Sequence, residues 1–516
     1  MSQKNKTEKK PSVAGAEITP LRRASGRSLA VASFSCGTCV MVLEMAGSRV
    51  VAPYMGTSLV VWTSLIGIVM ASLTLGYWAG GRVSDRRPDP GLLAKIIGGA
   101  AFFSLLVGIA ANPLLGLLSR NVRNVYVGSV IASICLFAVP SVLLGMVSPF
   151  IVRLAMHNLG SAGSTVGKFS ALSSAGSILG TFLGGFVLIS FLSSQAILFL
   201  VAVVLGLTAL QLHAAAKKIL LPLVVLAAGL GILSEAGAMP MTPDGINIET
   251  PYNTIRIMDT NVWLTNREVR ILQTDPMGAQ SLMYLDAPDE LYSDYTKFYD
   301  LAFHYKPDAK RVLMLGGGGY CVPRHLGATR PDVAIDVVEL DPGITKAARD
   351  YFHLADRPDQ RIFHEDARMF VNRESARGEL KYDAVFEDVF GSAYSIPFHL
   401  TTTECMGAIR SLLADDGVLV INIISEIHGE LFAGIYSSIA AHFPNVMIYP
   451  ATYPNSAAVR QNVMIVALCS ETIPERAPES DYMASLLAHR WTAPYEPRIA
   501  AFTDAFAPVE KYSLIR

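Results

Sequence analysis

The chain has 516 residues, of which 51% are hydrophobic and only 16% are charged, and its formal net charge is −1. Ordinary soluble domains carry roughly 25% charged residues, so this composition indicates a protein with a large apolar part. The length exceeds one compact core and predicts roughly two or three domains. The chain has no dense basic patch, which argues against a nucleic-acid partner.

An apolar region follows a short basic tail. Residues 1–28 are polar and basic, and we expect them to be disordered. Over 29–237, seven apolar segments each approach the roughly 20 residues that a membrane-spanning helix needs. No small-residue cleavage site follows the first of them, so the start of the chain is predicted to be a retained anchor. The predicted spans of this α-helical membrane domain are 29–48, 59–81, 93–115, 126–152, 166–191, 195–213 and 218–237.

Polar and small residues inside the predicted spans have competing interpretations. Glu44 lies within the first span and Arg49 near its end, which indicates either a function or an ion pair that locks two helices. Cys36 and Cys39 form a CxxC in the same span. Structural metal sites need more ligands than this pair, so close helix packing is the favoured interpretation. Glycines recur at four-residue spacing in the fifth span and predict a close helix approach, at Gly176, Gly180 and Gly184.

The distribution of positive charge predicts an orientation and creates a conflict. Fifteen Lys and Arg residues fall in the tail and on alternate loops, against Arg49, Arg120 and Arg123 on the other side. The positive-inside rule then places the N-terminus in the cytoplasm of a bacterial inner membrane. Seven spans would put the C-terminal domain outside, where its cofactor is not made, unless one segment is re-entrant. Segment 218–237 is the weakest span, and cofactor supply favours a cytoplasmic C-terminal domain.

The second half has the pattern of an α/β domain preceded by a small β-layer. After a linker over 238–250, residues 251–308 contain three short β-like runs and a helical segment. Over 309–516 apolar strands alternate with helices, with at least six strands. Such alternation is typical of a mainly parallel, Rossmann-like sheet of the class I methyltransferase type with helices on both faces.

Three features follow successive strands of this predicted sheet. A glycine run follows the first strand, where the lack of side chains lets the backbone approach a ligand. Glu339 ends the second strand, close to the spacing at which an acid binds ribose hydroxyls. Asp366 ends the third strand and can accept a hydrogen bond from an adenine amino group. Ligands bind at the carboxyl ends of such strands, so the sequence predicts a nucleoside-binding edge. The glycines are Gly316, Gly317, Gly318 and Gly319.

These residues resemble a known enzyme family. The stretches YNTIRI, LMLGGGG, VVELD, EDAR and YDAVFEDVF resemble the polyamine aminopropyltransferases, or spermidine synthases, in the bacterial form that is fused to membrane spans. The resemblance covers about 247–470. It implies that the sheet binds decarboxylated S-adenosylmethionine, with Glu339 at the ribose, Asp366 at the adenine and Asp388 at the amine.

Several positions depart from the family pattern. The family's glycine loop reads GGGDGG, and this chain has Gly319 in place of the acid. The family's fourth-strand motif has a second Asp where this chain has Gly391. Gln280 and Tyr292 match the family's Gln and Tyr only with a register shift of one residue. The loss of the acid at Gly319, with Arg324 a few residues on, predicts a site that admits intact S-adenosylmethionine.

Alkyl transfer from a sulfonium to an amine needs a base near the nitrogen. An amine with a pKa near that of lysine, about 10.4, must lose a proton close to attack. Asp388 is the candidate catalytic base, with Glu387 beside it as a candidate substrate-binding residue. Neighbours on a strand point to opposite faces, so only one of the two should enter the pocket. Four aromatic residues are either a cation-binding cage or, as we favour, core and lid packing: Trp263, Tyr292, Tyr295 and Tyr394. Tyr292 and Tyr295 are the substrate-binding candidates among them.

Three functions stay open from the sequence. The leading one is a transferase that uses S-adenosylmethionine or its decarboxylated form and passes an aminopropyl-type group to a small-molecule amine, releasing methylthioadenosine. The second keeps the donor but cleaves it without an amine, or transfers its methyl group. The third is a membrane transport or sensing protein whose α/β domain binds a nucleoside without turnover. The ten histidines show no ligand spacing, so we expect no metal, and a homo-oligomer stays open.

Overall fold

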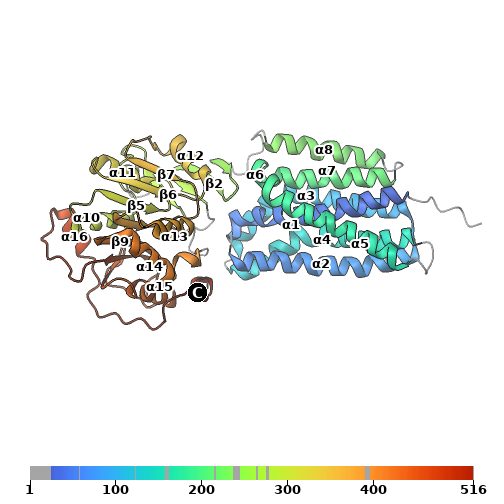
Figure 1. Ribbon diagram of the computed structural model, residues 1–516. Coiled ribbons are helices and arrows are strands. Elements are labelled where there is room, and N and C mark those ends of the chain that lie inside the picture. Colours follow the sequence, from blue (N-terminus) through green and yellow to red (C-terminus); the bar gives the residue numbers. More distant parts are fainter. Residues whose placement is uncertain are drawn as a thin grey trace, which may run out of the picture.

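The chain folds into two halves that lie side by side. In the computed structural model the described residues are 25–514 without 57, 123, 157–161, 214–216, 236–244, 263–264, 275–277 and 390–395. Figure 1 shows a bundle of long helices next to an α/β domain. Trp263, Gly391 and Tyr394 fall outside the described residues, as does most of the predicted tail, so the predictions for them stay untested.

The first half is a bundle of apolar helices. Among the described residues seven helical runs are long and apolar enough to cross a membrane, which confirms the predicted number. α5 continues through a π-helical segment, η2, into the short α6, so these three elements form one run. The elements are α1 (Gly26–Met55), α2 (Leu59–Arg86), α3 (Pro90–Asn121), α4 (Val125–Ala155), α5 (Ala162–Phe182), η2 (Leu183–Leu188), α6 (Ile189–Phe191), α7 (Ser194–Leu212) and α8 (Lys217–Glu235).

Glycine allows pairs of these helices to approach closely. A Cβ atom at Gly176 or Gly180 of α5 would collide with the backbone of α1, and one at Gly37 of α1 would collide with α5. Gly76 of α2 meets the backbone of α4 in the same way. Apolar side chains gain little by leaving lipid for another helix, so such close contact is what stabilises membrane helix pairs. The glycine run of the fifth span is therefore a packing surface, as predicted.

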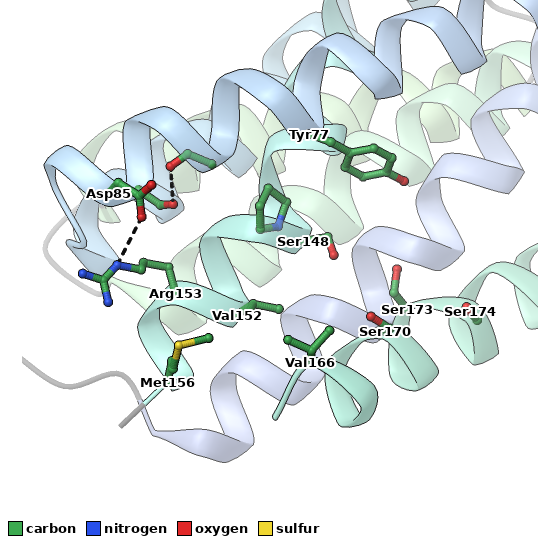
Figure 2. Close-up of a pocket in the computed structure, with 13 residues that line it drawn as sticks. Tyr77, Asp85, Ser148, Val152, Arg153, Met156, Val166, Ser170, Ser173 and Ser174 are labelled. Carbon is green, nitrogen blue, oxygen red and sulfur yellow. Dashed lines mark hydrogen bonds and ion pairs between the residues drawn. The ribbon is translucent and has the colours of Figure 1, made fainter. Parts of the chain in front are cut away.

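A groove of about 590 Å³ with both polar and apolar lining lies between α2, α4 and α5. Figure 2 shows hydroxyl groups along it, among them those of Tyr77, Ser148 and Ser173. Asp85 and Arg153 form an ion pair of 3.4 Å near one end of the groove. Polar groups are costly to expose to acyl chains, so the ion pair and the hydroxyl groups of this groove favour a position near water or another helix.

A four-stranded antiparallel sheet begins the second half within the described residues. β2 (Thr254–Asn261), β3 (Glu268–Gln273) and β4 (Ser281–Tyr284) are the three predicted β-like runs. β1 (Ile246–Glu249) lies where we expected a linker, so that part of the linker prediction is wrong. Because β1 pairs along its whole length with β2, tertiary contact supplies what the short segment lacks in strand propensity.

A seven-stranded mixed sheet forms the centre of the C-terminal domain in the described residues. Its order is β10-β11-β9-β8-β5-β6-β7, and β11 runs antiparallel to both of its neighbours. The predicted mainly parallel Rossmann-like sheet is confirmed, and β10 is a strand that we did not predict. The strands are β5 (Arg311–Leu315), β6 (Ala334–Val338), β7 (Gln360–Phe363), β8 (Tyr382–Glu387), β9 (Leu413–Ser425), β10 (Asn445–Pro450) and β11 (Gln461–Leu468).

Helices cover both faces of this sheet. On one face pack the linking helices α9 (Asp294–Lys297), η4 (Phe298–Asp300) and α10 (Leu301–Tyr305), together with α11 (Cys321–Thr329) and α12 (Pro342–Tyr351). On the other face pack α13 (Ala367–Arg377), α14 (Thr403–Leu412) and α15 (Glu430–Ala440). α16 (Asp481–Leu487) and α17 (Val509–Leu514) complete the domain. Two separate apolar layers therefore hold the sheet, and the carboxyl ends of its parallel strands meet at one edge.

The start of the bundle and the C-terminal domain lie at opposite ends. The bundle residues that contact the α/β half include Arg49 late in α1, Leu59 at the start of α2 and Ser194 at the start of α7. α1 begins at the far end of the bundle (Figure 1). α8, which corresponds to the weakest predicted span, is also long and apolar enough to span a membrane. Seven crossings, an odd number, would put the start of α1 and the C-terminal domain on opposite sides of a membrane.

Candidate active site

The ends of β5, β6 and β8 are joined by backbone hydrogen bonds at one edge of the large sheet. The amide of Gly316, just after β5, donates to the carbonyl of Val338 at 2.9 Å. The amide of Asp388, just after β8, donates to the carbonyl of Leu315 at 2.9 Å. Gly316 has a φ of +90°, and a Cβ atom there would collide with the carbonyl of Asp388. Position 316 therefore requires glycine for its conformation and for space.

The carboxylate of Glu339 holds the glycine loop. Its Oε2 accepts the amides of Gly317 at 2.9 Å and Gly318 at 3.3 Å, and its Oε1 accepts the amide of Asp341 at 2.9 Å. Glu339 is 7% exposed, and burial raises the pKa of its carboxyl against the opposing effect of these three donors. A carboxylate has about four lone-pair sites, so Glu339, with three amide donors, can still accept from a hydroxyl group of a ligand at this edge.

Asp388 is held by two side chains from different elements. Tyr295 of α9 donates its hydroxyl to Oδ2 at 3.1 Å, and Asn422 of β9 donates its amide to Oδ1 at 3.0 Å. Asn422 in turn accepts from Asn462 of β11 at 3.0 Å. Burial raises the pKa of Asp388, and the two hydrogen bonds offset this only in part. The edge thus holds an oriented carboxylate with a raised pKa, which suits a general base.

Glu387 points to the opposite face of the strand. Its side chain is 0% exposed and lies near Cys405 of α14, and neither carboxylate oxygen has a hydrogen-bond partner among the described residues. Burial, and then the charge of Asp388, raise the pKa of Glu387 to about 8. Glu387 is therefore mostly protonated at neutral pH. We withdraw it as a substrate-binding candidate, which leaves Asp388 as the acid that faces the site.

Asp366 follows β7 and caps α13. Its Oδ1 accepts the amide of Met369 at 3.0 Å, and its Oδ2 lies 3.4 Å from Nε2 of His399. His399 belongs to the short turn η5 (Phe398–Leu400), which Arg368 ties to α13 through the backbone of His399. Asp366 lies at the same edge of the sheet as Glu339, because β6 and β7 are parallel neighbours. An adenine at Asp366 would have His399 as a neighbour, which the sequence did not indicate.

The small β-layer brings Gln280 close to the glycine loop. Gln280 accepts a hydrogen bond from the hydroxyl of Thr274 at 2.8 Å. The next residue, Ser281, accepts the amide of Gly319 at 2.8 Å. The first residues of β4 and the loop are therefore in direct contact, and Gln280 stays a candidate for donor binding.

Of the two candidate tyrosines, Tyr292 and Tyr295, only Tyr295 forms a hydrogen bond with Asp388 among the described residues. Tyr292 packs its ring against Tyr284 of β4, with 5.0 Å between ring centroids. Tyr295 donates to Asp388 as described above. Burial and the neighbouring Asp388 raise the pKa of Tyr295 well above its ordinary value, so its hydroxyl stays protonated and can donate. Tyr295 is thus the tyrosine positioned at the site.

One family model matches part of the C-terminal domain. Residues 296–477 match the family model described as the spermine/spermidine synthase domain. The C-terminal domain is spermidine synthase-like. The matched residues include the glycine loop, Glu339, Asp366 and Asp388, and they exclude the helical bundle and β1–β4.

The spermidine synthase-like domain is similar in sequence to two bacterial proteins. A polyamine aminopropyltransferase of Vibrio vulnificus is 28% identical over 244 residues, which cover 44% of this chain and 79% of that protein. Polyamine aminopropyltransferase 2 of Streptomyces coelicolor is 26% identical over 440 residues, which cover 78% of this chain and 75% of that protein. That second match is longer than the whole C-terminal half, so the likeness extends into the bundle. A solved structure of a probable spermidine synthase from Corynebacterium glutamicum, 20% identical, covers 48% of this chain and 87% of its own, with a TM-score of 0.40.

The spermidine synthase-like loop has a structural reason for lacking its acid. A Cβ atom at Gly319 would lie 2.8 Å from Cβ of Ser281 and 3.1 Å from the ring of Phe352. Ser281 thus occupies the space that a longer residue at 319 would need. Arg324 does not take the place of the acid, because its guanidinium donates to the carbonyls of Phe352 and Pro288. The prediction that the site admits intact S-adenosylmethionine therefore rests on the missing acid at Gly319 and not on Arg324.

Some residues of the spermidine synthase-like site were missed from the sequence. Asn422 interrupts an apolar run of β9, and Asn462 precedes one in β11. A strand amide in such surroundings needs a partner, so the sequence offered an indication of these two residues. Ser281 and His399 carried no such signal, since their positions depend on how distant segments meet. Among the described residues no group of three or more His, Cys, Asp or Glu side chains is placed to hold a metal ion.

Proposed function

We propose that residues 309–516, with the small β-layer of residues 251–308, form a transferase that acts on S-adenosylmethionine or decarboxylated S-adenosylmethionine. The reaction is aminopropyl-type transfer to a small-molecule amine with release of methylthioadenosine, as in polyamine biosynthesis. The observation that carries the proposal is Asp388, an oriented carboxylate with a raised pKa directly beside the glycine loop. The names of the relatives from Vibrio vulnificus and Streptomyces coelicolor support it.

The donor would lie along the edge of the sheet. The backbone of Gly316–Gly319 would border its sulfur and ribose, and Glu339 would accept from the ribose hydroxyls. Asp366 would accept from the adenine amino group, with Gln280 above the loop. Each of these roles uses a group that the strands β5, β6 and β7 already bring to one edge.

The amine would then meet Asp388. An alkyl ammonium has no free electron pair, so a proton must pass from nitrogen to the carboxylate before or during attack. The nitrogen pair forms a bond to the carbon next to sulfur, and the carbon–sulfur bond breaks. Its electron pair stays on sulfur, which leaves as a neutral thioether. Tyr295 and Asn422 would orient the carboxylate, and the raised pKa of Asp388 makes it a stronger proton acceptor.

The test is release of methylthioadenosine by the purified full-length protein, measured by mass spectrometry. S-adenosylmethionine and its decarboxylated form are supplied separately, each with and without putrescine. We expect release that requires both a donor and the amine. Release from S-adenosylmethionine alone would replace transfer by cleavage. No release from any combination would reject the proposed reaction.

A second candidate is the use of intact S-adenosylmethionine, by cleavage or by methyl transfer. The observation that favours it is Ser281, which fills the space beside Gly319 where the family has an acid. An acid there would repel the carboxylate of S-adenosylmethionine, and a serine would not. The four donor and amine combinations above separate cleavage from aminopropyl transfer, and transfer of labelled methyl groups identifies the third reaction.

We also propose a sidedness for the protein in a bacterial inner membrane. The start of α1 and the basic last turns of α2 and α4 share the end of the bundle away from the C-terminal domain, so the positive-inside rule favours the outer side for that domain. Donor supply had favoured the cytoplasm. Alkaline phosphatase fused to the C-terminus is active only outside the cytoplasm, so active fusions support the outer side and inactive ones overturn it.

A further inference from the structure

Arg49 joins the first membrane helix to the beginning of the α/β half. Its guanidinium donates to the backbone carbonyls of Thr250 and Pro251, with 2.8 Å to the carbonyl of Pro251. No ion pair between Arg49 and Glu44 is present in the described part of the chain. Arg49 binds backbone carbonyls of the α/β half instead of pairing with Glu44. A planar guanidinium that grips two successive carbonyls fixes the direction of the backbone as well as its position.

A second membrane helix holds the preceding residue. Glu249 accepts both the amide and the hydroxyl of Ser194, at 2.8 and 2.9 Å. Ser194 is the first residue of α7, where unpaired amides favour an acidic partner. The end of β1 and the turn that follows it are therefore held from two helices of the bundle.

Thr250 extends this contact to the end of β6. Thr250 is 6% exposed, and its hydroxyl donates to Oδ2 of Asp341 at 2.5 Å, while Asn253 donates to the same oxygen at 3.2 Å. The methyl group of Thr250 lies against Gly343, where a Cβ atom would collide with it. Asp341 is 0% exposed and caps α12 by accepting the amide of Gly343 at 2.8 Å. The turn after β1 and the start of α12 thus form one locked unit.

Asp341 in turn orients Glu339. The backbone amide of Asp341 donates to Oε1 of Glu339 at 2.9 Å, while Oε2 accepts the amides of Gly317 and Gly318. A displacement of Asp341 would rotate the Glu339 carboxylate or cost it one of its three donors. The direction of the acid that we assign to the ribose therefore depends on a residue held by the bundle-anchored turn.

We propose that Arg49 is a positioning residue for the donor site, acting through Thr250 and Asp341 on the carboxylate of Glu339. The inference rests on the proposed function, because it assumes a donor ribose at Glu339. It gives the membrane half an indirect role in donor binding, because the bundle holds one wall of the donor site in its binding geometry.

The plain alternative is that Arg49 only joins the two halves. Another contact between them offers a matched control. Glu510 of α17 accepts the amide of Leu59 at the start of α2, at 3.1 Å, and within the described residues it has no hydrogen bond to Asp341. A joining role predicts the same effect from both contacts, and a positioning role predicts an effect from Arg49 alone.

The experiment measures the affinity of the full-length protein, in detergent or nanodiscs, for methylthioadenosine. We expect Arg49→Gln to weaken binding by about tenfold, the worth of one lost hydrogen bond to a charged group. Glu510→Gln should change it by less than about twofold. The 2′,3′-dideoxy analogue of methylthioadenosine lacks the hydroxyls that Glu339 would hold. Arg49→Gln should therefore leave the affinity for this analogue nearly unchanged, and in turnover it should raise KM while kcat stays close to that of the parent.

Thr250→Val gives a second route that leaves Arg49 in place. Valine keeps the shape of the side chain and removes the hydroxyl, which donates to Asp341 and accepts the amides of Tyr252 and Asn253. It should therefore weaken methylthioadenosine binding in the same direction. The proposal is overturned if the parent binds methylthioadenosine and both variants, Arg49→Gln and Thr250→Val, bind it as tightly as the parent. It is also overturned if both ligands weaken alike, or if Glu510→Gln matches Arg49→Gln. A parent that binds no methylthioadenosine at all would reject the proposed function itself.

Discussion

Two neighbouring acids, Glu387 and Asp388, lie on opposite faces of the central sheet and have different hydrogen-bonding environments. At the end of β8, Asp388 faces the layer of α9 and receives hydrogen bonds from Tyr295 and Asn422. One residue earlier, Glu387 faces the layer of α14 and has no hydrogen-bond partner among the described residues. Both carboxyls have raised pKa values because of burial, yet only Asp388 has donors that stabilise its charged form.

The difference shows that environment, rather than residue type, assigns the role. A carboxylate with two donors can ionise and stay oriented, which suits proton transfer. A carboxyl without donors is kept neutral by its apolar surroundings and behaves as part of the core. The comparison predicts that changes at Asp388 affect turnover, whereas changes at Glu387 affect stability.

The largest expected effect is that of Asp388→Asn. The amide keeps the size of the side chain and removes the proton acceptor, so turnover should fall by roughly 10²- to 10⁴-fold. Binding of methylthioadenosine should change little, because the adenosyl group is assigned to other residues. Mass spectrometry of the product and calorimetry of ligand binding measure the two quantities.

Asp383→Asn is the matched control for that variant. Asp383 lies near the other end of β8 and accepts the amides of Lys310 and Arg311, at 2.7 and 2.9 Å. It should alter thermal stability and leave turnover close to the parent value. If Asp388→Asn turned over like the parent, Asp388 would not be the catalytic base.

How far the sequence predicts this molecule follows from the range of the contacts involved. The apolar runs and glycine spacings identify the seven spans, and alternating strands and helices identify the large sheet, because both signals are local. Gly316, Glu339 and Asp366 could be placed at one edge since parallel strands end together. β1 depends on pairing with β2, and the partners of Asp388 come from α9 and β9, far away in the chain. Such hydrogen-bond partners cannot be identified from the sequence before the strand order is known.

The second prediction uses the neutral state of Glu387. Its ordinary pKa of 4.5 rises to about 8 in the fold, so between these values the folded protein binds more protons than the unfolded chain. Unfolding free energy should therefore fall as pH rises through this window, by up to about 1.4 kcal/mol per pH unit. Glu387→Gln cannot ionise and should lose this dependence.

Thermal unfolding of the full-length protein at several pH values measures that effect. The midpoint of Glu387→Gln should exceed that of the parent by an amount that grows as the pH is raised from near 4.5 toward 8, with turnover near the parent value. Parallel pH dependences for parent and variant would show that Glu387 does not titrate in this range. A large loss of turnover would return Glu387 to the list of site residues.

The smallest expected effect is that of Tyr295→Phe, and it tests the donors rather than the acid. The hydroxyl of Tyr295 lowers the pKa of Asp388 against the larger effect of burial, so its removal should raise that pKa further. A base acts in its ionised form, so the acidic limb of the pH profile for kcat/KM should move to higher pH. At neutral pH the loss of kcat/KM should be at most about tenfold, the worth of one hydrogen bond, and it should diminish as the pH rises.

Tyr299→Phe is the control. The hydroxyl of Tyr299 donates to the backbone carbonyl of Glu387 at 3.1 Å, so its removal should leave the acidic limb of the pH profile in place. If both variants shift the limb equally, packing of the aromatic layer sets the pKa of Asp388, and the hydrogen bond from Tyr295 has no separate role.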